Sequence, residues 1–213
     1  MVFKRRDARN WLRIVAEFFY PRGGWRRAAS YIVHRLRRLP DPPHKIARGI
    51  AAGVFVCFTP FFGFHFFLAA GLAFVMQGNI LASLLATFFG NPLTFPIIAA
   101  ISLELGQWML GTPGVGPLPD VFADFGRASA ELWHNFQALF TSESAHWDRL
   151  GRFFWRVMWP YTVGGLVPGV IAGVAAYLLA RPAVAAYQRR RISRLKARYE
   201  RRAKSQDGPG RGQ

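Results

Sequence analysis

Apolar residues dominate two adjoining stretches of the chain, from Ile46 to Gln77 and from Ile80 to Leu110. At about 1.5 Å per residue, a continuous helix over either stretch would be about 46–48 Å long. The hydrocarbon core of a membrane is about 30 Å thick, and an ordinary span uses about 20 residues. Each stretch is therefore too long for one ordinary span and too short for two spans joined by a turn.

A proline lies near the middle of both stretches, Pro60 in the first and Pro92 in the second. Proline removes a helical hydrogen bond and clashes with the preceding turn, so a helix kinks or ends there. We therefore predict that each stretch is a broken helix or a re-entrant hairpin. Aligning the two prolines superimposes similar halves 32 residues apart, which leaves an internal repeat open.

A third apolar stretch runs from Val157 to Ala180 and is long enough for one span. Gly165, Gly169 and Gly173 are four residues apart, so they form a small-residue face that favours close helix packing. Amphipathic patterns flank these stretches in the N-terminal arm and over residues 120–150, and such helices suit a membrane interface. For the arm, a soluble helix packed on the rest of the protein is the alternative.

These patterns predict an all-α fold: a polytopic helical membrane protein with two proline-broken or re-entrant segments, one further glycine-rich span and amphipathic interfacial helices. The expected domains are a basic amphipathic arm over 1–45, a membrane domain over 46–180, and a basic cytoplasmic helix with a disordered tail over 181–213. A non-cytoplasmic amphipathic insert over 111–156 interrupts the membrane domain.

The distribution of charge agrees with a membrane protein and argues against a nucleic-acid-binding protein. The 213 residues carry a net charge of +17, but residues 49–119 hold a single charged side chain, Glu104. Lys and Arg instead gather in residues 1–48, with 13, and in residues 181–213, with 11. A soluble domain must show a polar face to water, which 71 nearly uncharged residues cannot provide. The flanking charge is typical of membrane topology.

Positive charge also predicts the orientation, because Lys and Arg favour the cytoplasmic side of a membrane. Both termini are therefore expected in the cytoplasm of a bacterial cell, in its inner membrane. Two cytoplasmic ends require an even number of crossings, although the chain has three apolar stretches. The simplest solution makes one of the first two stretches re-entrant and the other a crossing. The sequence does not say which.

Polar side chains inside the apolar stretches are the candidate substrate-binding groups. Breaks in a membrane helix expose backbone donors and acceptors that can hold an ion or a headgroup, and a buried ionisable residue is costly unless it is paired. Structural kinks, and a glutamate close enough to the headgroups to reach water, are the alternatives. The candidate residues are Thr59, Pro60, Gly63, His65, Asn79, Asn91, Pro92, Thr94 and Glu104.

Signatures of catalysis, metal binding or cofactor binding are not found in the sequence, so we expect no enzyme, metal or cofactor. A nucleotide-binding glycine loop, HExxH and Gly-x-Ser-x-Gly are missing. His134, Glu143, His146 and Asp148 match no metal-site spacing, so a solvated surface is the interpretation.

The elements quoted above resemble the bacterial membrane proteins grouped as domain of unknown function 2062, from about Pro21 to Arg191. The resemblance depends on Thr59-Pro60 with Gly63 and His65, and most specifically on Asn91-Pro92-Leu93-Thr94. It implies a multi-pass membrane protein, and members of such a family can be fused to glycosyltransferase-like enzymes. It carries over no catalytic residue.

Two functions remain open. In the first, the protein passes or handles a small solute or the headgroup of an envelope lipid or glycan carrier at its breaks. In the second, it is a non-catalytic membrane anchor or assembly partner for envelope-biogenesis proteins. The expected partners are anionic membrane lipids at the basic termini and either a second copy or an envelope-biogenesis protein, but not nucleic acid.

Overall fold

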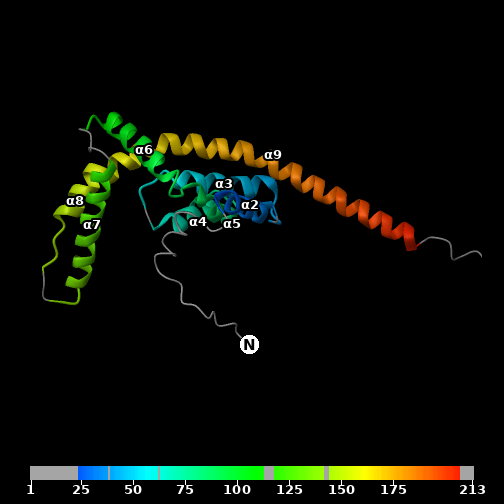
Figure 1. The fold of residues 1–213 in the computed structure, drawn as a ribbon, viewed down its shortest axis with the longest axis horizontal. Helices are drawn as coiled ribbons and strands as arrows, with labels where there is room; N and C mark the ends of the chain where they lie inside the picture. Colours follow the sequence, from blue (N-terminus) through cyan, green and yellow to red (C-terminus); the bar gives the residue numbers. More distant parts are fainter. Residues whose placement is uncertain (1–23, 38, 62, 113–117, 142–143, 207–213) are drawn as a thin grey trace, which may run out of the picture. The chain divides into compact units, whose positions relative to one another are not determined.

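The computed structural model of the protein describes residues 24–37, 39–61, 63–112, 118–141 and 144–206. All regular structure in these residues is helical, which confirms the predicted all-α class (Figure 1). The chain forms two compact units, residues 1–40 and residues 41–213.

The first unit contains helix α2, Gly24–Arg37. It corresponds to the second of the amphipathic helices predicted for the arm, whereas the first of them lies outside the described residues. Within α2 the Arg35 side chain donates a hydrogen bond of 3.0 Å to the Tyr31 hydroxyl and lies over its ring. Tyr31 and Val33 are both exposed.

The second unit holds the remaining helices. In chain order they are α3 (Pro43–Val56), α4 (His65–Val75), α5 (Ile80–Ala86), the short helix η1 (Thr87–Phe89), α6 (Phe95–Leu110), α7 (Leu118–Ala138), α8 (Asp148–Phe153), the π-helical turn η2 (Phe154–Met158) and α9 (Trp159–Gln206).

Helices α3 and α4 form a hairpin. Pro43 opens α3, where its missing N–H costs nothing. After α4 the chain returns to the beginning of α3, where the Asn79 N–H donates to the Lys45 carbonyl oxygen at 2.9 Å. The Arg48 guanidinium donates to the Met76 carbonyl oxygen at 3.0 Å and joins the same two ends.

Helices α5 and η1 run alongside α3 in the same direction. A methyl group on Gly49 would overlap the Asn79 carbonyl oxygen, and one on Gly53 would overlap that of Ser83. Glycine at these two positions therefore lets the backbones approach closely. Further along, the Cys57 thiol donates to the Thr87 carbonyl oxygen at 3.3 Å.

Helix α9 packs in the opposite direction against both α6 and α3. Near its beginning, a methyl group on Gly106 of α6 would overlap the Pro160 carbonyl oxygen. Further along, Gly165 contacts the Phe58 backbone, and Gln188 donates to the Asp41 carbonyl oxygen at 2.9 Å. Helices α6 and α3 thus follow one another along α9, and the predicted small-residue face of Gly165, Gly169 and Gly173 packs against α3.

Helices α7, α8 and η2 form a lobe at the beginning of α9. Its core joins side chains from α6, α7, α8, η2 and α9: Ala99, Leu103, Ala128, Phe153, Val157 and Tyr161. Glu131 of α7 accepts hydrogen bonds from the backbone N–H groups of Arg149 and Leu150, at 3.2 and 2.5 Å, and so caps the first turn of α8.

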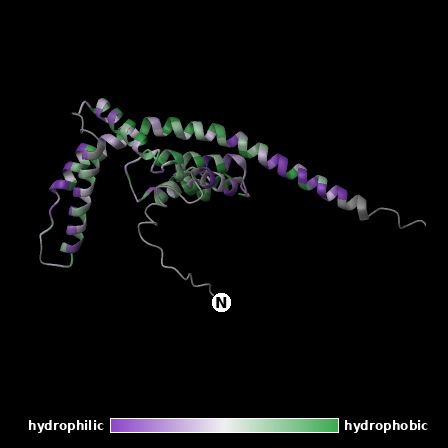
Figure 2. Cartoon of the chain, in the orientation of Figure 1, coloured by the Kyte–Doolittle hydropathy of each residue, from purple (hydrophilic) through white to green (hydrophobic). Residues whose placement is uncertain are grey.

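Among the described residues, one continuous helix is long and apolar enough to cross a membrane, Asp148–Arg201 with 54 residues. It contains the predicted glycine-rich span. Figure 2 shows hydrophobic residues along the first half of α9 and hydrophilic residues along its last part. The apolar helices α4, α5–η1 and α6 are individually shorter than an ordinary span.

Candidate functional site

The structure divides the predicted site residues among three places. The first is the break junction, which we define as residues 57–61 and 63–65 together with residues 87–94. It contains seven of the nine predicted residues: Thr59, Pro60, Gly63, His65, Asn91, Pro92 and Thr94. Asn79 and Glu104 lie elsewhere.

The first break is a turn between α3 and α4 that its own side chains hold. The Thr59 hydroxyl donates to the Val56 carbonyl oxygen at 2.8 Å, and Pro60 is buried. Gly63 adopts φ +86°, a conformation that favours glycine. His65 Nε2 lies 3.0 Å from the Thr59 carbonyl oxygen. Because a carbonyl only accepts, this contact requires the proton on Nε2.

The second break is closed by the Asn-Pro-x-Thr element. Asn91 Oδ1 accepts from the backbone N–H groups of Leu93 and Thr94, at 2.9 and 3.2 Å. Thr94 Oγ1 donates to the Phe89 carbonyl oxygen at 2.5 Å and accepts from the Asn91 N–H at 3.0 Å. These bonds satisfy backbone groups that the end of η1 and the beginning of α6 leave free.

The two breaks meet although 30 residues separate them. The hydrogen bond from Cys57 to Thr87 crosses from one to the other, and the rings of Phe58 and Phe89 stack with centroids 6.2 Å apart. A Cβ atom on Gly90 would lie 3.1 Å from the Cys57 sulfur. Two helices therefore end at the junction, α3 and η1, and two begin there, α4 and α6.

Large apolar side chains surround the junction. Their exposed fractions are high for side chains of this kind, between 38% and 64%. Such a rim can contact lipid or the apolar portion of a ligand. The polar atoms of the breaks are largely hydrogen-bonded to one another. The exposed side chains are Phe61, Phe64, Phe88, Phe89 and Leu93.

Asn79 lies at the opposite end of α3 and caps a helix. Its Oδ1 accepts from the Ala82 N–H at 2.6 Å, and its amide donates to the Asp41 carboxylate. This amide, and the Lys45 ammonium 3.3 Å away, hold the pKa of Asp41 below its ordinary value of 3.8. Asn79 thus joins α5 to the segment before α3 and does not reach the junction.

Glu104 lies on the exposed side of α6. It falls between Ser102 and Gly106, the residues through which α6 contacts the beginning of α9. Nine residues separate it from the start of α6 at Phe95, which is about 14 Å along a helix. The structure therefore does not bring Glu104 to the break junction.

The chain matches, over residues 26–193, the family described as "Uncharacterized protein conserved in bacteria (DUF2062)". This match covers most of the chain. The protein belongs to the DUF2062 family. The predicted resemblance is thereby confirmed, and the DUF2062 region includes both breaks and the lobe of α7 and α8. No curated protein and no solved structure matches the chain.

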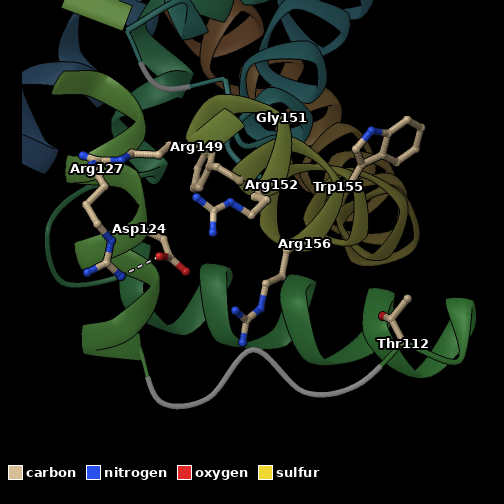
Figure 3. A pocket seen from close by; sticks show the side chains of 9 residues that line it. Thr112, Asp124, Arg127, Arg149, Gly151, Arg152, Trp155 and Arg156 are labelled. Carbon is tan, nitrogen blue, oxygen red and sulfur yellow. Dashed lines mark hydrogen bonds and ion pairs between the residues drawn. The ribbon is translucent and has the colours of Figure 1, made fainter. Parts of the chain in front are cut away.

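One feature of the lobe was not predicted from the sequence. Its four arginines, Arg127, Arg149, Arg152 and Arg156, line a single pocket (Figure 3). The spacing of the last three, three and then four residues apart, places them on one helix face and is the signal that identifies them.

Proposed function

We propose that this protein crosses the bacterial inner membrane twice, through α5–α6 and through α9, and that the α3–α4 hairpin is re-entrant. The hairpin begins and ends at the level of Asp41 and Asn79, beside Gln188 of α9. Its turn reaches only Gly165 of α9, while α6 continues to Pro160. Two crossings leave both basic termini on one side, as positive-inside bias requires.

The low burial of α9 supports a lipid environment for it. Only 22% of its most apolar window is buried inside the protein. The core helix of a soluble protein would be mostly buried. Arg181 follows Trp159 by 22 positions, so the helix between them is about 33 Å long. This length matches a hydrocarbon core of about 30 Å.

On this topology, we propose that the protein handles a small solute or the headgroup of an envelope lipid at the break junction, without covalent chemistry. The carrying observation is the meeting of both breaks at Cys57 and Thr87. The junction contacts α9 at Gly165, which lies within the apolar part of that helix, about 9 Å along its axis from Trp159. Non-helical backbone is tolerated at that depth only where protein or a watery cavity covers it.

The second candidate is a non-catalytic membrane anchor or assembly partner. The hydrogen bonds of Asn91 and Thr94 favour it, because they satisfy the broken backbone without a ligand. A dry junction of this kind is a structural kink. Access of water to the junction therefore separates the two functions.

Cysteine accessibility tests this difference in a Cys57→Ala background. Phe64→Cys and Leu93→Cys place thiols at exposed positions of the two breaks, and a membrane-impermeant thiol reagent is applied from each side in turn. If the junction handles a polar group, both positions are labelled, and from one side only. Phe67→Cys, on the exposed face of α4, is the matched control and stays unlabelled in lipid.

Absence of labelling at both Phe64→Cys and Leu93→Cys, from either side, would overturn handling at the junction. The anchor would then be the better account. Labelling of Phe67→Cys to the same extent would show that α4 faces water, which would contradict the re-entrant hairpin.

A further inference from the structure

The lobe of α7, α8 and η2 borders an open pocket of about 980 Å³. Arg149, Arg152 and Arg156 border it from successive turns of α8 and η2, and Arg127 borders it from α7. Figure 3 shows the Arg152 and Arg156 side chains extending from the helix into this space, while Trp155 points away from them. These four arginines are all the basic residues of segment 120–156.

Positive charge in the pocket exceeds its negative charge. Asp124 is its one carboxylate among the described lining residues and forms an ion pair of 2.6 Å with Arg127. Glu131, nearby, is engaged with the backbone of α8. Within the described part of the chain, Arg149, Arg152 and Arg156 have no ion-pair partner. The Arg152 Nε–H donates to the Asp148 carbonyl oxygen at 3.2 Å, and Arg149 and Arg152 also border a neighbouring pocket lined by Glu131 and Asp148. Three guanidinium groups without an ion pair nevertheless line one pocket.

On the proposed topology, the pocket lies at a membrane surface. Trp155 and Trp159 are exposed and their rings lie 6.2 Å apart, directly where α9 begins. Exposed tryptophans of this kind mark the interface between hydrocarbon and headgroups. Arg152 and Arg156 are within one helical turn of Trp155, so the pocket opens at the level of lipid headgroups.

We propose that this arginine pocket binds a phosphate ester or diphosphate group. Guanidinium groups offer planar forks of N–H donors that match phosphate oxygens in pairs, and several forks around one space favour a multiply charged anion. Ordinary interfacial charge is an insufficient explanation, because positive residues are depleted on the side of the membrane opposite the basic termini. The site lies outside the break junction, so this proposal rests on the proposed topology but not on what the junction does.

The test uses the full-length protein in a neutral detergent, titrated with inorganic pyrophosphate and, separately, with dioctanoyl phosphatidic acid. Both are expected to bind if free and lipid-borne phosphate are recognised alike. Phosphatidic acid alone is expected to bind if the ligand is a lipid headgroup. In either case Arg149→Gln/Arg156→Gln weakens binding by at least about tenfold, because hydrogen bonds to charged groups are lost.

Two further variants make the result specific. Arg26→Gln/Arg27→Gln removes the same charge from exposed positions of α2 and leaves affinity unchanged. Arg149→Lys/Arg156→Lys keeps the charge but removes the planar forks, so its affinity falls between the wild-type and glutamine values. The lysine pair also serves if the glutamine pair does not fold, which the thermal unfolding midpoint reveals.

Three results would overturn the proposal. The first is that neither pyrophosphate nor phosphatidic acid binds. In the second, the Arg149/Arg156 variants, the lysine pair included, retain wild-type affinity. The third is an equal loss of affinity in the Arg26/Arg27 variant, which would show that binding follows net charge.

Discussion

Thr94 joins the two sides of the second break through one hydroxyl group. It donates to the Phe89 carbonyl oxygen and accepts from the Asn91 N–H. Its removal leaves the Asn91 N–H without this partner and the Phe89 carbonyl oxygen with a long bond of 3.4 Å from the Asn91 amide. In an apolar environment each such group is costly, because no water replaces the partner.

We therefore predict that Thr94→Val lowers the free energy of unfolding by about 1–3 kcal/mol. Chemical unfolding of the purified protein in detergent measures this change. Thr94→Ser is expected to keep most of the wild-type stability, because serine retains the hydroxyl. Thr141→Val is the matched control. Its hydroxyl bonds to the Gln137 carbonyl oxygen on an exposed surface, so the expected change is within about 0.5 kcal/mol. Equal effects at Thr94 and Thr141 would show that the break does not need its side-chain bonds.

At the scale of elements, close contact between α6 and α9 depends on glycine. A methyl group on Gly106 would overlap the Pro160 carbonyl oxygen, and one on Gly164 would overlap that of Ser102. Both obstacles are backbone atoms, which cannot move aside as a flexible side chain does. Either substitution must therefore separate the two helices.

Gly106→Ala is expected to lower the free energy of unfolding by about 1–3 kcal/mol, the usual cost of overpacking a close contact. Gly71→Ala in α4 is the control, since nothing lies within 4 Å of its added methyl group. Because alanine favours a helix over glycine, Gly71→Ala leaves stability unchanged or raises it by up to about 1 kcal/mol. The comparison uses the same unfolding measurement. A neutral Gly106→Ala would contradict the contact between α6 and α9.

For the whole molecule, the proposed two crossings predict opposite sides for the lobe and the C-terminal part of α9. Gln137 of α7 and Ser193 of α9 are both exposed. In a Cys57→Ala background, Gln137→Cys reacts with an impermeant thiol reagent in intact cells whose outer membrane is permeabilised. Ser193→Cys reacts only after the inner membrane is opened. Labelling of both cysteines from one side would show that α9 does not cross the membrane, which would contradict the proposed topology.

Local sequence features were sufficient to predict the helical class and the two breaks. Pro60 and Pro92 lie in the two breaks, as predicted, and the Asn-Pro-x-Thr element became a closed turn. Proline alone does not decide a break, because α9 continues through Pro168 and Pro182. The glycines of the third stretch became the contact face of α9, because their spacing follows the helical period. The family, too, was identified from such local elements.

Sequence alone determined an all-helical chain of the DUF2062 family, with two broken segments and a long apolar helix between basic ends. Tertiary structure decided which distant residues meet. It joined Cys57 to Thr87, kept Asn79 and Glu104 away from the junction, and gathered four arginines around one pocket. The reason is physical: propensity and periodicity act over a few residues, whereas these contacts depend on how whole helices pack through their small-residue faces.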